Sequence, residues 1–270
     1  MPTITLISDW QNDDYYISSV KGRILGEIPG AGIVDITHRI QHFSIAQAAF
    51  ILRSSYRSFP DGTVHIIGVN SEANEKHPYV AVRYRNHFFI CADNGIFGLM
   101  FEDEPEEIII LNEKEISSFP ELSLFVPAAA HICAGKPLFE LGRKTDHLNR
   151  PTHLLPAFDN NSINGSVVYI DSYNNIITNI TRELFEKVAK GRYFEIYPQS
   201  NHYKITRINK RYNETTPGEI LALFNSLGLL EIAMNQGNIA ELLSLNISST
   251  IRIKFFDKKE TDTTLLDNFK

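Results

Sequence analysis

The sequence of 270 residues lacks the features that mark several large classes of protein. Its two cysteines, Cys91 and Cys133, stand in apolar surroundings without metal-ligand spacing, which argues against a disulfide framework or a cysteine zinc site. We expect buried free thiols in a reducing compartment, and therefore a cytoplasmic location. No apolar run approaches the roughly 18 residues of a membrane span. A strand pattern begins at Ile4 without a basic leader, so we expect neither a secretory signal nor a membrane partner.

The common cofactor and nucleophile motifs are also missing. No G-x-G-x-x-G follows a predicted strand, and there is no phosphate-binding P-loop and no H-E-x-x-H zinc motif. The G-x-S-x-G motif of the α/β-hydrolases is absent as well. A net charge of −6, a pI near 5.9 and the lack of a basic block argue against nucleic acid as a partner.

Apolar patterns in the first half of the chain alternate between strand and helix. This alternation predicts parallel strands joined by right-handed crossovers. The predicted elements are strands 4–7, 33–36 (buried), 63–69 and 107–111, helices 15–28, 44–57 and 128–134, and a hairpin over 79–91 that turns at Arg85-Asn86.

The second half is rich in short strand patterns separated by turn signals, which indicates a small barrel or sandwich. One short helix is predicted after Thr181, a suitable N-cap. A polar stretch over 145–163 is interpreted as the connection. The predicted fold is therefore α/β, with an N-terminal α/β domain (1–150) built on a mainly parallel sheet and a smaller β-rich C-terminal domain (151–270).

Polar residues follow the ends of several predicted strands in the first domain. Asp9 follows the first strand, the segment 70–77 follows the third, and Asp93-Asn94 follow the hairpin. In open α/β sheets, ligands bind beyond the carboxyl ends of the strands. A carboxylate there can accept hydrogen bonds from both hydroxyls of a ribose. The alternative is that Asp9 or Asp13 only caps the next helix.

A second polar set lies in the β-rich half, and turn chemistry is the alternative explanation for each of its members. The set consists of Asp171, Asn175, Asn179, Tyr212, Asn225, Ser226 and Asn235. His131, on an alanine-rich helix, is either a hydrogen-bonded core residue or a functional one. Two polar sets in two domains suggest a ligand held at a domain or subunit junction.

Motifs in the same order along nearly the whole chain resemble those of the SAM hydroxide adenosyltransferases, the adenosine-forming S-adenosylmethionine (SAM) hydrolases related to fluorinase and chlorinase. The matching segments are 6–9 with Asp14, 33–38, 59–65, 92–95, 127–135, 171–179, Tyr212, 217–219 and 225–233. Each motif alone is weak, and their order and spacing together are specific.

The resemblance implies a C-terminal β-barrel and a homotrimer with sites between subunits, with SAM as substrate and neither cofactor nor metal. It implies that Asp9 holds the ribose hydroxyls and that Asp171 and Ser226 hold the methionine end. Asn175 would bind the nucleoside portion, and Tyr212 would stack on adenine, for roughly 1–3 kcal/mol.

The sequence departs from the family pattern where water is activated. The family uses an Asp–Arg–His set, and the corresponding positions here read Asn70, His77 and His131. The His-Gly-Arg-Asp segment of the family reads Pro120-Glu121-Leu122-Ser123, and the glycine after the Asp9-aromatic pair is Gln11. Asn70 can orient water but cannot accept its proton, and the loss of a general base typically costs about 10²–10⁴-fold.

Two hypotheses therefore stay open. The first is an enzyme of reduced or altered activity that hydrolyses SAM to adenosine and methionine by in-line attack of water on the ribose 5′ carbon, with a histidine taking the proton. The second is a pseudoenzyme that binds SAM or adenosine and does not hydrolyse it.

Overall fold

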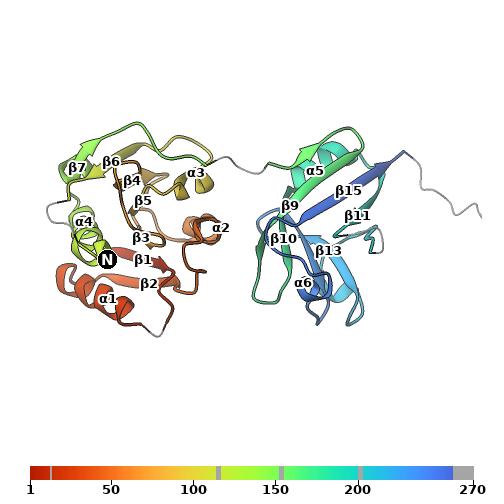
Figure 1. Cartoon of the computed structure of the whole chain (residues 1–270), viewed down its shortest axis with the longest axis horizontal. Coiled ribbons are helices and arrows are strands. Elements are labelled where there is room, and N and C mark those ends of the chain that lie inside the picture. The colour runs from red at the N-terminus through yellow and green to blue at the C-terminus, as the bar shows by residue number, and fades with distance from the viewer. Residues whose placement is uncertain (13, 114–116, 152–154, 200–202, 258–270) are drawn as a thin grey trace, which may run out of the picture. The chain divides into compact units, whose positions relative to one another are not determined.

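The computed structural model describes residues 1–12, 14–113, 117–151, 155–199 and 203–257. The chain divides into two compact units, Met1–Thr152 and His153–Lys270, and each is described by itself (Figure 1). Of the predicted connection over 145–163, residues 152–154 lie outside the described residues, and so does Asp13, the alternative helix cap.

The N-terminal unit contains a seven-stranded sheet with the order β2-β1-β3-β5-β4-β6-β7. Its strands are β1 (Thr3–Ser8), β2 (Gly32–Thr37), β3 (Val64–Gly68), β4 (Tyr79–Tyr84), β5 (His87–Ala92), β6 (Glu107–Leu111) and β7 (Gly142–Lys144). β2, β1, β3 and β5 pair in parallel, whereas β4 runs antiparallel to both β5 and β6. The predicted mainly parallel α/β sheet is confirmed.

Helices cover both faces of this sheet (Figure 1). They are α1 (Tyr15–Glu27), α2 (Ile45–Ser55), α3 (Ile96–Met100) and α4 (Val126–Cys133), with short turns η1 (Tyr56–Ser58), η2 (Glu121–Phe125) and η3 (Leu138–Leu141). Alternate residues of β1 serve the two faces, because successive strand side chains point in opposite directions. Ile4 and Leu6 pack with α1 and α4, and Ile7 packs with α2 and α3.

One strand differs from its prediction. Residues 33–36 were predicted to be a buried strand, but β2 is an edge strand and Val34 is 41% exposed. An apolar run of this kind occurs in central strands and in edge strands alike. Which of the two it becomes depends on strand pairing between segments that are distant in sequence. The hairpin of β4 and β5 is confirmed, with Arg85 and Asn86 both at positive φ, as a two-residue hairpin turn requires.

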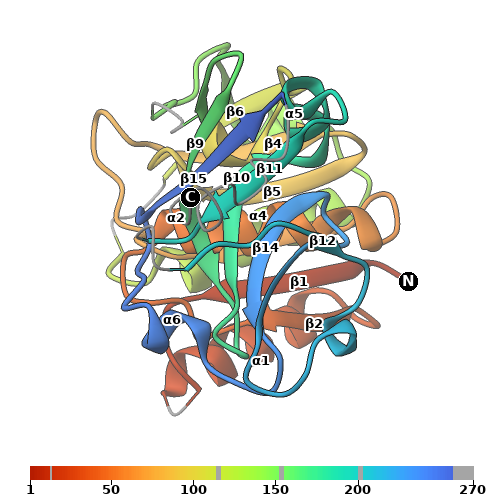
Figure 2. The ribbon, with the colours of Figure 1, turned by 90° about the vertical axis from the view of Figure 1, so that its right-hand side faces the viewer.

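The C-terminal unit is a curled half-barrel sheet (Figure 2). The predicted β-rich fold of the second domain is confirmed. The strand order is β11-β15-β9-β10-β14-β13-β12, with β8 beside β9. The strands are β8 (Ala157–Phe158), β9 (Ser162–Ile170), β10 (Ile176–Thr181), β11 (Tyr193–Tyr197), β12 (Ile208–Asn209), β13 (Ile220–Phe224), β14 (Leu229–Met234) and β15 (Thr250–Phe256).

The helices of this unit are α5 (Arg182–Ala189) and α6 (Ile239–Leu242), with the turn η4 (Tyr212–Glu214). Thr181 caps α5 by accepting a hydrogen bond from the Leu184 N–H, as predicted. Phe185 of α5 closes a core that includes Ile176 and Ile232 of the sheet.

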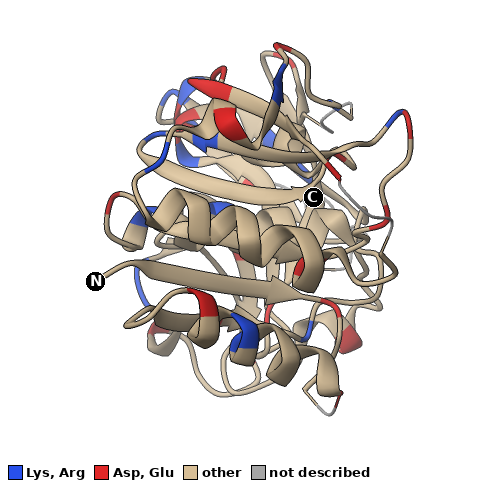
Figure 3. Ribbon diagram, turned by 90° about the vertical axis from the view of Figure 1, so that its left-hand side faces the viewer, with Lys and Arg blue, Asp and Glu red and all other residues tan. Residues whose placement is uncertain are grey.

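None of the helices among the described residues is long and apolar enough to cross a membrane. Acidic and basic residues are interspersed over the face of the N-terminal unit that Figure 3 shows.

Candidate functional site

Asp9 lies at the carboxyl end of β1, where its backbone N–H donates to the Gly68 carbonyl of β3 at 3.2 Å. The residue is 8% exposed, and its Oδ2 accepts a hydrogen bond of 2.8 Å from the Phe43 N–H. Helix α1 is capped by Asp14, whose carboxylate accepts from the Tyr15 N–H. Asp9 is therefore not the helix cap, and its carboxylate is fixed at the edge where open α/β sheets bind ligands.

The aromatic ring of Trp10 packs against the end of β3. A Cβ placed at Gly68 would lie 2.4 Å from Trp10 Cζ2 and 3.0 Å from Glu121 Oε1, so the backbone of β3 can approach both side chains only as glycine. Trp10 also stacks on His38, with ring centroids 6.1 Å apart. The ring thus packs against both the end of β3 and the imidazole of His38.

His38 braces the end of β1. Its Nδ1 lies 2.7 Å from the Ser8 hydroxyl, and its Nε2 lies 3.2 Å from an Asp35 carboxylate oxygen. The order Ser–His–Asp is that of a hydrolase triad, but Ser8 is 1% exposed and cannot meet a substrate. Burial lowers the pKa of His38, so the neutral imidazole is favoured and acts as a structural link.

Hydrogen bonds to Asn94 and Asp93, and a backbone pairing within the segment, hold residues 70–77 after β3 in place. Asn94 Nδ2 donates to the carbonyls of Val69 and Asn70, at 3.0 and 2.9 Å. Asn70 is exposed and has a positive φ of 47°. The backbones of Asn74 and His77 pair across a tight turn, and His77 Nδ1 lies 3.0 Å from the Asp93 carbonyl.

Asp93 organises the neighbouring loop instead of facing the site. Its carboxylate accepts from the Asn149 backbone N–H at 3.1 and 2.9 Å and from the Asn149 amide at 3.0 Å. Burial raises the pKa of Asp93, and these hydrogen bonds oppose the rise.

Glu121 is a buried carboxyl group at the same edge of the sheet. It begins the π-helical turn η2, is 2% exposed, and accepts a hydrogen bond from the Ser71 hydroxyl. Burial raises the pKa of Glu121 to about 7, and the negative charge of Asp9 adds to the rise.

His131 lies in the last turn of α4. Its Nε2 is 2.8 Å from the Pro137 carbonyl oxygen and 3.8 Å from a Glu140 carboxylate oxygen. Within the part of the chain that the structure describes, no hydrogen bond or ion pair joins any two of Asn70, His77 and His131.

In the C-terminal unit, Asp171 and Asn175 form the turn between β9 and β10. Asp171 Oδ1 accepts from the Tyr173 and Asn175 N–H groups, at 2.9 and 2.8 Å, and its Oδ2 accepts from the Asn175 amide at 3.1 Å. Turn chemistry therefore accounts for the present hydrogen bonds of both side chains.

Tyr212 and Ser226 line one pocket of about 470 Å³ in this unit. The Tyr212 hydroxyl donates to Glu231 at 2.7 Å, and the Asn225 amide donates to the other Glu231 oxygen at 3.2 Å. The ring of Tyr212 is thus anchored at its hydroxyl while the residue stays 44% exposed. Burial is the main cause of the raised pKa of Tyr212, and the Glu231 hydrogen bond adds to it.

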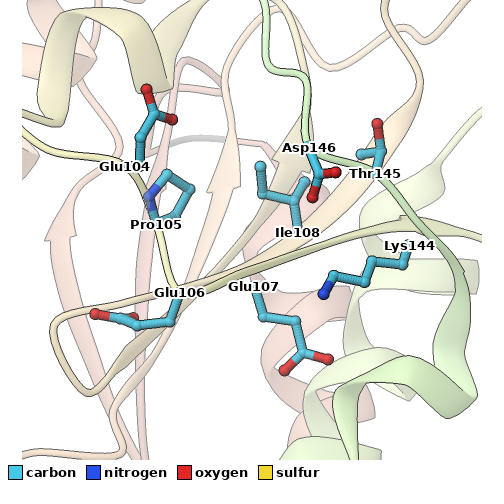
Figure 4. A pocket seen from close by; sticks show the side chains of 8 residues that line it. All are labelled: Glu104, Pro105, Glu106, Glu107, Ile108, Lys144, Thr145 and Asp146. Atoms are coloured by element: carbon cyan, nitrogen blue, oxygen red, sulfur yellow. The ribbon is translucent and has the colours of Figure 1, made fainter.

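A second hollow, of about 300 Å³, lies between the start of β6 and the end of β7 (Figure 4). Glu106, Glu107 and Lys144 are among its lining residues. Glu107 is the first residue of β6, whereas Asp9 follows the last residue of β1, which runs in the same direction. The hollow therefore lies at the amino ends of the parallel strands, whereas Asp9 lies at their carboxyl ends. No group of three or more His, Cys, Asp or Glu side chains is placed to hold a metal within the described residues.

Both units match sequence models of one family. Residues 4–142 match the SAM hydroxide adenosyltransferase N-terminal domain, and residues 165–252 match the SAM hydroxide adenosyltransferase C-terminal domain. The chain belongs to the SAM hydroxide adenosyltransferase family. This confirms the resemblance drawn from the sequence motifs.

Relatives in this family include two proteins named (R)-S-adenosyl-L-methionine hydrolase. The one from Thermus thermophilus is 26% identical over 269 residues, covering 94% of this chain and 100% of that protein. The one from Methanocaldococcus jannaschii is 26% identical over 262 residues, covering 93% and 95%. A fluorinase from an Actinoplanes species is 23% identical over 290 residues, covering 93% and 97%.

Solved structures agree with the fold. An uncharacterized conserved protein from Thermotoga maritima superposes with a TM-score of 0.84 at 26% identity, covering 93% of this chain and 99% of that one. A conserved hypothetical protein from Thermus thermophilus gives a TM-score of 0.74 at 26% identity, covering 95% and 100%.

Three site residues were missed by sequence reasoning. Glu231 left a detectable signal, because it is a lone charge in the apolar run of β14. Trp10 is the aromatic residue that follows Asp9, and no pattern in the sequence indicated that its ring packs against β3. Glu121 had been noted only as a departure from the family pattern, and its burial depends on packing against Gly68 and Trp10.

Proposed function

We propose that this protein hydrolyses SAM to adenosine and L-methionine by in-line attack of water on the ribose 5′ carbon. The observation that carries the proposal is the match of both units to the SAM hydroxide adenosyltransferase family. The relatives named SAM hydrolase, which are matched over nearly their whole length, support the same reaction. SAM is the substrate, no cofactor takes part, and the assembly proposed is a homotrimer.

The proposed binding roles follow the motif positions. Asp9 accepts hydrogen bonds from the ribose hydroxyls, which its fixed and nearly buried carboxylate supports. Asp171 and Ser226 hold the methionine end, and Asn175 binds the nucleoside portion. Tyr212 stacks on adenine.

The chemistry asks little of the protein beyond positioning. The leaving group is a neutral thioether expelled from a sulfonium, so the enzyme must orient one water and accept its proton. Asn70 is proposed to orient the water. His77 and His131 are the proposed proton acceptors, because each has one ring nitrogen hydrogen-bonded to a carbonyl and the neutral ring keeps a lone pair on the other.

Incubation of the purified protein with SAM tests the reaction. Chromatography is expected to show adenosine and methionine in equal amounts, above the spontaneous background in buffer. The second candidate is a protein that binds the nucleoside without hydrolysing it, and Asn70 favours it because an amide cannot accept the water proton. Calorimetric binding of SAM with adenosine only at background would support that second candidate and contradict hydrolysis.

Replacing Tyr212 by alanine is expected to weaken adenosine binding by about 1–3 kcal/mol, because the stacking face is lost. Tyr212→Phe is the matched control, since it keeps the ring and removes only the hydrogen bond to Glu231. Isothermal titration of adenosine measures both variants. Equal affinity of the alanine variant and the wild type would remove Tyr212 from the adenine site.

A further inference from the structure

Among the acidic side chains at the carboxyl edge of the N-terminal sheet, Glu121 has no role in the reaction as described so far. It is 2% exposed, it packs against the end of β3 at Gly68, and the negative charge of Asp9 acts on it. Its hydrogen-bond donor is Ser71, the residue next to Asn70. A buried carboxyl group therefore connects through one hydroxyl to the segment proposed to orient the water.

The two histidines proposed as proton acceptors are not joined to Asn70 or Ser71 by any hydrogen bond among the described residues. His77 uses Nδ1 on the Asp93 carbonyl, and His131 uses Nε2 on the Pro137 carbonyl. Asp9 accepts from the Phe43 N–H and is assigned to the ribose. Asn70 has no basic atom. Glu72 and Glu75 of the segment are exposed, whereas Glu121 is a buried carboxyl group that accepts a hydrogen bond from the segment.

Resting on the proposed function, we propose that Ser71 and Glu121, in place of a histidine, form the proton relay for the attacking water. The water oxygen bonds to the ribose 5′ carbon while the carbon–sulfur bond breaks, and the bonding pair leaves with sulfur as the neutral thioether of methionine. The water proton passes to Ser71 Oγ as the Ser71 proton passes to Glu121. After product release, the proton returns to solvent and the carboxylate is regenerated.

The surroundings of Glu121 suit this task. Among the described residues, the Asp9 carboxylate directly after β1 and the Tyr79 phenol of β4 interact electrostatically with Glu121. Tyr79 also interacts with Glu72 and Glu113. The ring of Trp10 and the backbone of Gly68 complete the enclosure. A pKa near 7 places proton acceptance close to neutral pH, where a general base is most effective.

Steady-state kinetics with SAM across the pH range tests the relay. For the wild type, kcat should fall as the pH drops through about 7, because the carboxylate must be ionised. Glu121→Gln should lower kcat by about 10²–10⁴-fold with KM nearly unchanged, and the residual rate should lose that pH dependence. Ser71→Ala should lower kcat similarly, whereas Ser71→Thr, which keeps the hydroxyl, should restore most of it.

Controls separate a chemical role from a structural one. Titration of the Glu121→Gln variant with adenosine shows whether the variant is folded and keeps the wild-type affinity for the nucleoside. A Glu121→Gln protein with wild-type kcat and pH profile overturns the relay and leaves the proposed function standing. A pH dependence that persists in Glu121→Gln and disappears in His77→Asn assigns the proton to the imidazole and also overturns it. If the wild type forms no adenosine at any pH, the proposed function fails, and the relay fails with it.

Discussion

Adenosine is expected to bind the Asp9→Ala variant on the order of 10²–10⁴-fold more weakly than the wild type, because two hydrogen bonds to an ionised acceptor are lost at about 1.5–3 kcal/mol each. Asp9 is 8% exposed and is oriented by the Phe43 N–H, so the free protein already holds the carboxylate in place. Little ordering cost offsets the bonds to the ribose. Isothermal titration calorimetry with adenosine measures the change.

The controls for Asp9 distinguish lost contacts from lost structure. Removing the carboxylate leaves the Phe43 N–H without its acceptor, which is expected to cost about 1–3 kcal/mol of folding stability. Asp14→Ala removes the cap of α1 and should lower stability by about 1 kcal/mol with adenosine affinity unchanged. Binding of 2′-deoxyadenosine to the wild type should show part of the Asp9→Ala loss. Wild-type affinity in Asp9→Ala would contradict the ribose assignment.

Folding stability is expected to reveal the buried acid at position 121. The pKa of Glu121 is raised from 4.5 in the unfolded chain to about 7 in the folded one. A raised pKa gives stability that is fully present below the unfolded value and is lost as the pH rises through the folded value. At 1.36 kcal/mol per pKa unit, the wild type should lose about 3 kcal/mol that Glu121→Gln does not lose.

Urea unfolding of both proteins between about pH 4 and about pH 8 measures this difference. The other carboxyl groups with raised pKa values, Asp93 and Glu231, are present in both proteins, so their contributions cancel in the comparison. Glu75→Gln, an exposed change in the neighbouring loop, is the matched control and should follow the wild type at every pH. A constant stability difference between Glu121→Gln and wild type would show that Glu121 titrates alike in both states.

Local signals predicted many elements of the fold correctly. The Arg85-Asn86 turn followed from a dipeptide between two strand patterns, and the Thr181 cap followed from its position before a helix. The position of a strand in the sheet could not be predicted from local sequence. Val34 reads as a core residue, but the order of strands leaves β2 at the edge. β7 was missed because Arg143 and Lys144 are exposed and are held in the sheet by pairing with β6.

The candidate site was predictable only in part, for the same reason. A carboxylate directly after the first strand pointed to Asp9, and the topology of α/β sheets explains why. Whether Asp9 capped the next helix was decided by Asp14, which competes for that position. The burial of Glu121 depends on a glycine and a tryptophan more than 50 residues away in sequence, so no local pattern could reveal it.

Hydrolysis in water labelled with the heavy oxygen isotope tests the central claim most directly. If water attacks the ribose 5′ carbon, mass spectrometry of the adenosine formed will show one heavy oxygen, located at the 5′ hydroxyl, and the methionine will carry none. Adenosine that stays at the spontaneous background, or that lacks the heavy oxygen, would contradict the account.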